Sequence, residues 1–213
     1  MEALLAEHGR TFADEAGIRL RDTPQPLYQL LVLSNLLSAR IRASVAVAAA
    51  RALFADGMRT PRHMLEATWQ QRVDALGEGG YRRYDERTAT QLGEGAELLL
   101  DTYGGDLRRL RKSADGDLGA LRDGLRRTPG IGPAGADIFL REAQELWPET
   151  APYLDKKALQ GAEQLGLPSS PAKLAELAEQ AGPEDRRGPA VLAAALVRAS
   201  LDKDVVADVR SHA

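Results

Sequence analysis

Apolar residues recur at helical spacing along almost the whole chain, and no segment shows the strict alternation that predicts a strand. Alanine and leucine dominate this pattern, while β-branched and aromatic residues are sparse. The sequence therefore predicts an all-α fold. Because no fixed internal period links the helices, the pattern favours a bundle over a repeat array.

Proline and glycine mark the predicted helix ends. The Thr23–Pro26 stretch should break the chain before a strongly apolar helix begins near Leu27, and a turn is expected at Ser38 or Arg40. The pattern predicts helices over residues 2–16, 27–40, 41–55, 61–68, 70–76, 84–102, 107–110 and 118–127.

A further group of helices is predicted after Pro148. Three more helices are predicted there, separated by residues 168–171 and 182–189, and they cover residues 153–167, 173–182 and 189–204. Their apolar faces are too large for a linker, so this tail should pack against the rest of the protein. We expect two lobes, a helical bundle from residues 24–147 and a second helical lobe from residues 1–23 and 148–213.

Composition narrows the class of protein. The 213 residues, of which 44% are hydrophobic, suffice for one large domain or two packed lobes. The lack of cysteine excludes disulfides, cysteine-ligated zinc and iron–sulfur clusters, and it fits a reducing compartment. The first residues, MEALLAEHGRTF, contain no continuous apolar stretch, and no later run is long enough to span a membrane. We therefore expect a cytoplasmic protein without a membrane partner.

Charge limits how the chain could bind nucleic acid. The net charge is -3 and the isoelectric point is about 5.7, which argues against a protein that coats nucleic acid through bulk positive charge. Any such contact must be local. Lysine and arginine do cluster at residues 82–83, 108–112, 126–127 and 156–157, although one such cluster alone is more often a solvated helix face.

One motif between two predicted helices has a specific backbone use: TPGIG at residues 128–132. Glycines on both sides of Ile131 permit a sharp turn and leave peptide N–H groups uncovered, while the isoleucine anchors the turn in the core. A helix begins next, at Pro133 or Ala134, where the helix dipole also favours an anion such as phosphate. On the motif alone, a plain corner whose glycines only relieve strain is an equal alternative.

This segment resembles the helix-hairpin-helix motif of the base-excision DNA glycosylase superfamily related to endonuclease III, in which Leu-Pro-Gly-(Val or Ile)-Gly precedes a helix; Thr128 replaces that leucine. LYQLLVLSNLLSAR (residues 27–40) resembles the family helix that ends in Leu-Leu-Ser-Ala-Gln, and GGYRRYDERTATQL (79–92) resembles the Gly-Leu-Tyr-Asn-x-Lys-Ala segment. WPETAPYLDKKALQ (147–160) resembles the stretch that ends in Val-Asp-Thr-His. Several matches in one order are more specific than any single motif.

The resemblance implies a bundle of about six helices with the helix-hairpin-helix motif, plus a second helical lobe from both chain ends. Double-stranded DNA would lie in the cleft between them, bound by a monomer. The backbone clamp would hold the phosphates of one strand, which sets register without reading sequence, and its residues would be Thr128, Gly130, Ile131, Gly132 and Ala134. A sodium or potassium ion would bind the carbonyl oxygens of Arg126, Thr128 and Ile131.

The resemblance also places Asp155 on the catalytic aspartate of the family. Cleavage of an N-glycosidic bond builds positive charge on the sugar, and a nearby carboxylate can stabilise this charge or orient the attacking water. The alternative is an N-cap, for which aspartate is a favoured residue at the start of the helix that follows. Both roles can hold together.

Two departures from the family narrow the chemistry. Relatives that also cut the strand carry a lysine two residues after the last glycine of the hairpin, and this lysine forms a Schiff base. This chain has Ala134 at that position. A lyase is therefore not expected, although Lys156 and Lys157, which follow Asp155, could contact phosphate or supply a displaced amine. The chain also lacks the four-cysteine cluster of many relatives, so we expect no iron–sulfur cluster and no other cofactor.

An enzyme that acts on a base within a duplex must flip it out, and a side chain then fills the gap. Arg40 stands at the position of the gap-filling glutamine of the family, and Arg83 at its second wedge position; a surface arginine is the alternative for each. The candidate base pocket contains aromatic rings for stacking and carboxylates for exocyclic amines, from Tyr81, Tyr84, Asp85 and Glu86.

The leading hypothesis is a monofunctional DNA repair glycosylase that removes a damaged or mismatched base by hydrolysis. A non-catalytic helix-hairpin-helix DNA-binding protein is the main alternative, favoured by Ala134, the acidic isoelectric point and the altered wedge residues. A helical interaction protein with an accidental hairpin is the third.

Overall fold

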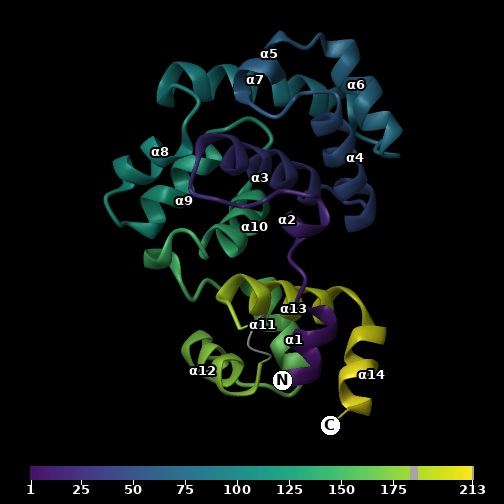
Figure 1. The fold of residues 1–213 in the computed structure, drawn as a ribbon, viewed down its shortest axis with the longest axis vertical. Coiled ribbons are helices and arrows are strands. Elements are labelled where there is room, and N and C mark those ends of the chain that lie inside the picture. The colour runs from purple at the N-terminus through teal and green to yellow at the C-terminus, as the bar shows by residue number, and fades with distance from the viewer. Residues whose placement is uncertain (183–186, 213) are drawn as a thin grey trace. The chain divides into compact units, whose positions relative to one another are not determined.

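The computed structural model describes residues 1–182 and 187–212. Regular structure in these residues is entirely helical, and it includes no strand (Figure 1). The predicted all-α class is confirmed. Within the described part of the chain, no helix is both long and apolar enough to cross a membrane.

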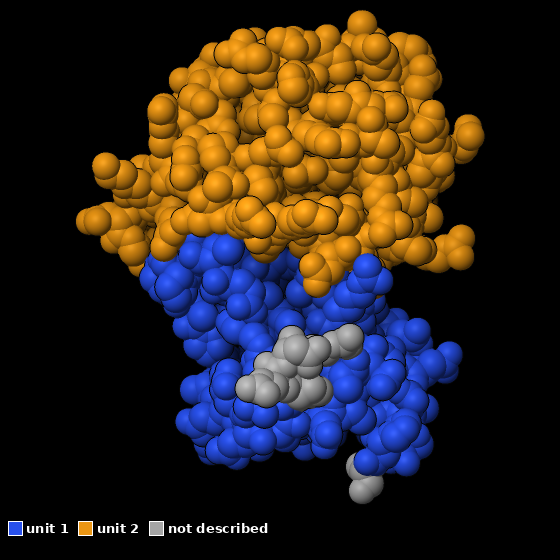
Figure 2. Space-filling view, in the orientation of Figure 1, with its two compact units in different colours: residues 1–12, 140–213 blue, residues 13–139 orange. Residues whose placement is uncertain are grey.

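The chain divides into two compact units, each coloured separately in Figure 2. Residues 13–139 form one unit, and residues 1–12 and 140–213 form the other. The division falls inside two helices, α2 (Phe12–Glu15) and α10 (Pro133–Ala143). The sequence-based boundaries lie elsewhere, after residues 23 and 147. They fall at breaks between helices, whereas the chain passes from one unit to the other within helices.

The larger unit is built around helix α3 (Pro24–Leu37), in which every residue from Leu27 to Leu36 is buried. A helix that is buried on all sides lies at the centre of a bundle. It packs against α4 and α8, while α5, α6 and α7 form a further contiguous group beside α4. The remaining helices of this unit are α4 (Ala43–Ala55), α5 (Pro61–Glu66), α6 (Trp69–Glu78), α7 (Asp85–Tyr103), α8 (Leu107–Ala114) and α9 (Leu118–Arg126).

The smaller unit is centred on helix α13 (Pro189–Leu201), whose buried face consists of alanine, leucine and valine. Small side chains allow close helix packing, and α11 comes nearest: a Cβ atom on Gly161 would overlap the backbone carbonyl of Leu196. Helix α1 packs on the same helix. The other elements of this unit are α1 (Glu2–His8), the 3-10 turn η1 (Pro148–Thr150), α11 (Lys156–Gln164), α12 (Pro171–Ala181) and α14 (Lys203–Ser211).

Several predicted helix ends are wrong, each for a local reason. The helix expected over residues 2–16 is two helices, because α1 ends at His8 and its C-cap Gly9 packs so closely on α13 that a Cβ there would overlap the Val191 side chain. Helix α3 begins three residues early because proline is tolerated in a first turn. The helix expected over residues 189–204 ends at Leu201, since Asp202 caps the next one. Part of the predicted 182–189 separator, residues 183–186, lies outside the described residues.

A buried arginine joins three helices of the larger unit. Arg72 of α6 is 8% exposed, and its guanidinium donates hydrogen bonds to the carbonyl oxygens of Met64 (2.9 Å), Ala67 (2.7 Å) and Ala89 (2.8 Å). Two of these carbonyls lie at the end of α5 and the third in α7. The side chain fits because α7 carries Gly93, where a Cβ would stand 2.8 Å from a guanidinium nitrogen. Burial lowers the pKa of Arg72 from its usual value.

Replacement of Arg72 should destabilise the larger unit strongly. Arg72→Met keeps most of the side-chain volume but removes this donor from two buried carbonyl oxygens and a part-buried one, so we expect a loss of about 2–4 kcal/mol in unfolding free energy. Urea denaturation followed by circular dichroism measures it. The control is Arg62→Met, because the exposed Arg62 side chain makes no ion pair or hydrogen bond with the described residues. Equal losses in both variants would contradict this assignment.

Candidate nucleic-acid interface

The TPGIG motif forms a tight turn between α9 and α10. The N–H of Ile131 donates to the carbonyl oxygen of Thr128 at 3.0 Å, and Gly130 has a φ of 83°. Proline at the second position and a positive-φ glycine at the third are typical of a type II turn. The first glycine of the motif is therefore required by backbone conformation.

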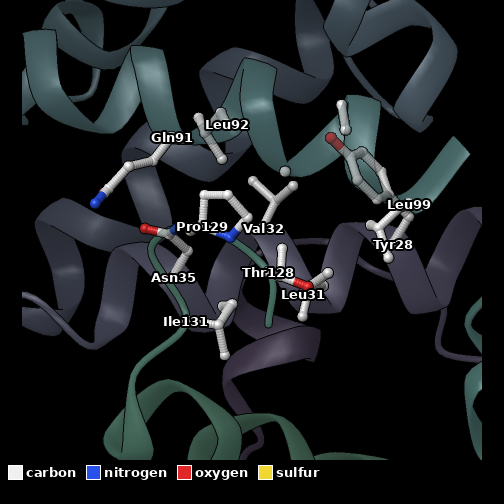
Figure 3. A pocket seen from close by; sticks show the side chains of 12 residues that line it. Tyr28, Leu31, Val32, Asn35, Gln91, Leu92, Leu99, Thr128, Pro129 and Ile131 are labelled. Atoms are coloured by element: carbon white, nitrogen blue, oxygen red, sulfur yellow. Dashed lines mark hydrogen bonds between the residues drawn. The ribbon is translucent and has the colours of Figure 1, made fainter. Parts of the chain in front are cut away.

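Helices α3 and α7 hold this turn closely. Thr128 is 6% exposed and Ile131 is 4% exposed, and both lie among side chains of the two helices in Figure 3. A Cβ on Gly130 would overlap the Asn35 amide and lie 3.0 Å from Oε1 of Gln91. The Asn35 amide also donates to the Pro129 carbonyl at 3.5 Å. Steric fit thus adds to the conformational need for glycine.

The cavity on the inner side of the turn is too small for a ligand. The apolar cavity beneath Thr128 and Ile131 measures about 20 Å³, which is room for about one water molecule. This face of the turn is therefore a packing surface, and any ligand of the motif must meet its other side.

The outer side of the turn presents backbone donors. Residues Gly132 and Ala134 are exposed, and among the described residues no group accepts a hydrogen bond from their N–H or from that of Gly135. Helix α10 begins here, with the Gly132 carbonyl accepting from the Ala136 N–H at 3.0 Å. Unpaired N–H groups at a helix N-terminus favour a bound anion.

An ion pair that the sequence analysis missed braces the two helices of the hairpin. Arg122 of α9 donates to both carboxylate oxygens of Asp137 of α10, at 2.8 and 3.3 Å. Bidentate geometry makes this pair more specific than a single surface contact. Their sequence separation gives no signal, because only the turn between the helices brings them together.

The carbonyl oxygens proposed for a cation retain free lone pairs. The Thr128 oxygen accepts one hydrogen bond, from the N–H of Ile131. Among the described residues, no donor reaches the carbonyl oxygens of Arg126 and Ile131. The sodium or potassium ion at these oxygens stays a prediction.

Asp155, in the smaller unit, is the N-cap of α11. Its Oδ1 accepts a hydrogen bond from the Ala158 N–H at 3.1 Å and lies 3.5 Å from a guanidinium nitrogen of Arg141. The Asp155 side chain is 12% exposed and that of Arg141 is 8% exposed. No described residue donates to Oδ2, which is also absent from the fully buried atoms that lack a partner. One carboxylate oxygen is thus held and the other remains accessible.

A buried glutamine orders the loop that leads to this aspartate. Gln144 is 1% exposed; its amide nitrogen donates to the carbonyl oxygens of Tyr153 and Pro189 at 3.1 and 3.3 Å, and its amide oxygen accepts from the Tyr153 N–H at 2.7 Å. The sequence analysis missed both Gln144 and Arg141. The sequence gives no clear signal for either residue, because residues 141–145 (REAQE) are mostly polar and nothing in the pattern marks which of them is buried.

The predicted wedge and phosphate-binding side chains lie at the surface, with one exception. Arg40, Arg83 and Lys156 are exposed, while Lys157 is half-buried and donates to Gln160 at 3.3 Å. The Arg83 guanidinium stands 5.3 Å from the centroid of the Tyr84 ring. These positions leave the three exposed side chains able to reach a large ligand.

The structure corrects the predicted base pocket. Tyr81 is 2% exposed, its hydroxyl accepts a hydrogen bond from Thr88 at 3.3 Å, and burial raises its pKa. Its ring is part of the core and cannot stack on a base. Tyr84 and Asp85 are half-buried and Glu86 is exposed, so these three remain candidates.

The two glycines of the turn should differ sharply when replaced. Gly130→Ala forces a side chain into a left-handed conformation and against Asn35, and we expect it to lower the unfolding free energy by about 2–3 kcal/mol. Gly132→Ala is the matched control, because a Cβ there meets nothing within 4 Å; it should cost about 0.5 kcal/mol or less. Urea titration tests both, and similar losses would contradict the described turn.

Comparison with known proteins does not assign the chain to a family. No protein-family model matches the chain, and no curated protein matches it. The chain is similar to a solved structure described as "Structure of a Trapped Endonuclease III-DNA Covalent Intermediate: Estranged-Adenine Complex", with 18% identity over 92% of this chain and 82% of that one, and a TM-score of 0.48. A likeness of this size establishes no shared function, so function must come from the residues of the chain itself.

Proposed function

We propose that the protein binds double-stranded DNA through the turn at residues 128–135 and is a repair glycosylase that removes a damaged or mismatched base. The observation that carries the proposal is the turn itself. Its inner face leaves a cavity of only about 20 Å³, while its outer face offers the N–H groups of Gly132 and Ala134 at the start of α10. Such a surface suits a phosphate of the DNA backbone.

The arrangement explains how a protein with a net charge of -3 could bind DNA. Backbone donors at a helix N-terminus attract phosphate without a basic surface. The exposed Arg127, which precedes the turn, adds local positive charge, while the charge of its neighbour Arg126 is paired with Asp123 at 3.0 Å. Arg40 and Arg83 are the side chains proposed to occupy the gap that a flipped base leaves.

Asp155 is the proposed catalytic residue. The cap to α11 and the Arg141 contact hold Oδ1 in place, while Oδ2 can face a substrate or a water molecule. As the bond between base and sugar breaks, its electron pair leaves with the base and positive charge builds on the sugar. A fixed carboxylate stabilises that charge and can accept a proton from the attacking water.

The product of this chemistry would be an intact strand with an abasic site. Ala134 has no amine to attack the sugar, so the hairpin offers no group for a Schiff base. Strand cleavage would then need alkali after the enzymatic step. Lys156, which is exposed beside Asp155, is proposed as a phosphate contact.

A non-catalytic DNA-binding protein is the second candidate, and one observation favours it. Asp155 already has a structural task, because it caps α11 and pairs with a buried arginine. If Asp155 serves only to cap α11 and pair with Arg141, the protein would bind DNA through the turn without catalysing base removal.

Asp155→Asn separates these two candidates. Asparagine also caps helices well but carries no charge, so base release should fall by about 100-fold or more while DNA affinity changes little. The measurement uses duplexes that each contain one lesion, incubated with protein and then treated with alkali to cut at abasic sites. The control is Asp202→Asn, which changes another capping aspartate in the same unit, on α14.

The two candidates predict different results in this assay. Release of one lesion by the parent protein and the control, but not by Asp155→Asn, supports the glycosylase. If the parent binds DNA yet releases no lesion, the non-catalytic candidate replaces it.

Ala134→Glu tests the clamp independently of chemistry. Ala134 is exposed in the first turn of α10, where glutamate favours the helix by about 0.3–1 kcal/mol but repels phosphate. We expect duplex affinity to fall about tenfold or more relative to Ala134→Gln, a neutral control of the same shape. Fluorescence anisotropy with a labelled duplex at fixed salt measures it, and equal affinities would exclude this surface from DNA binding.

A further inference from the structure

A second feature of the larger unit is a polar hollow of about 410 Å³ beside α2, α3 and α4. Its size lies within the range of small-molecule sites. Three arginines and two glutamines contribute to its wall, and none of its lining residues is acidic. The hollow shares no lining residue with the turn at residues 128–132.

One polar side chain in this wall is largely buried, has no partner among the described residues and keeps its amide accessible from the hollow. Gln29 of α3 is 9% exposed, and no described residue forms a hydrogen bond with its side-chain amide. A buried amide normally finds a partner in the protein, in water or in a ligand. Since Gln29 lines the hollow, its missing partner would enter from there.

The three arginines of the wall are available to a ligand. Arg19, Arg51 and Arg59 are exposed, and none of them forms an ion pair with a described residue. Arg59 donates from Nε to the Phe54 carbonyl at 2.6 Å. This bond restrains the Arg59 side chain in the wall of the hollow and leaves its remaining N–H groups for an anion.

The backbone supports the same charge preference. The first turn of the 14-residue helix α3 contributes Gln25 and Pro26 to the wall, and its N-cap residue Thr23 makes no side-chain cap. The positive end of that helix dipole therefore faces the hollow. The opposing end of α4 would disfavour an anion, but Arg59 already neutralises one of its carbonyls, that of Phe54.

We propose that this hollow binds a small anion that carries a pyrophosphate group. Guanidinium groups match phosphate oxygens in geometry and charge, and several of them favour two linked phosphates over one. The Gln29 amide would donate to an inner oxygen. A DNA backbone fits this site poorly, because a phosphate on a rigid duplex cannot enter a hollow deep enough to reach a side chain that is 9% exposed.

The test is calorimetric titration of the full chain with inorganic pyrophosphate and, separately, with orthophosphate. We expect saturable binding of one pyrophosphate, at least about fivefold tighter than orthophosphate. Arg51→Gln and Gln29→Leu should each weaken pyrophosphate binding, the first by about tenfold, as expected for one charge-assisted hydrogen bond. The control Arg62→Gln removes an exposed arginine outside the wall and should bind as the parent does.

Three results would overturn the proposal: no saturable binding, equal weakening by Arg51→Gln and Arg62→Gln, or stoichiometric displacement of pyrophosphate by a short duplex. The last would assign the arginines to DNA. Thermal melting of each variant identifies any loss of affinity that comes from unfolding, and Arg51→Lys, which keeps the charge, should then recover part of the binding.

Discussion

The close fit of Gly130 against Asn35 is the contact on which the hairpin depends. A positive-φ residue without a side chain lets the turn descend between α3 and α7, and Thr128 and Ile131 then fill the space below it. Because the inner side is packed, the backbone donors of the next residues are directed outward. The core of the larger unit and its candidate phosphate site are thus two sides of one turn, and a change that loosens the first also disorders the second.

The smaller unit shows how a capping residue can be compatible with catalysis. Asp155 holds the start of α11 through a single oxygen, and Arg141 and Gln144 at the end of α10 order the surrounding loop. A carboxylate fixed in this way has little freedom to rotate, which is what electrostatic stabilisation of a developing charge requires. Structural and chemical roles can therefore coincide here without conflict.

The sequence predicted the helical class, the position of the hairpin and the capping role of Asp155, because each depends on local features such as periodicity, a proline–glycine turn and a helix start. It did not predict the Arg72 hydrogen bonds, the Arg122–Asp137 pair or the burial of Tyr81. These depend on which helices meet, and periodicity alone does not determine that. Helix ends failed for a similar reason, since Gly9 ends α1 through a close tertiary approach as well as its own propensity.

The outer face of the hairpin is made of amide dipoles, and this has a consequence for its response to salt. Condensed counterions leave DNA when lysine or arginine neutralises its phosphates, and that release makes binding fall steeply as ionic strength rises. Donors such as the N–H groups of Gly132 and Ala134 carry no net charge and displace few counterions. Binding through these donors would change little over a wide range of ionic strength, and its salt sensitivity would come from the charged side chains around the turn and from Lys156.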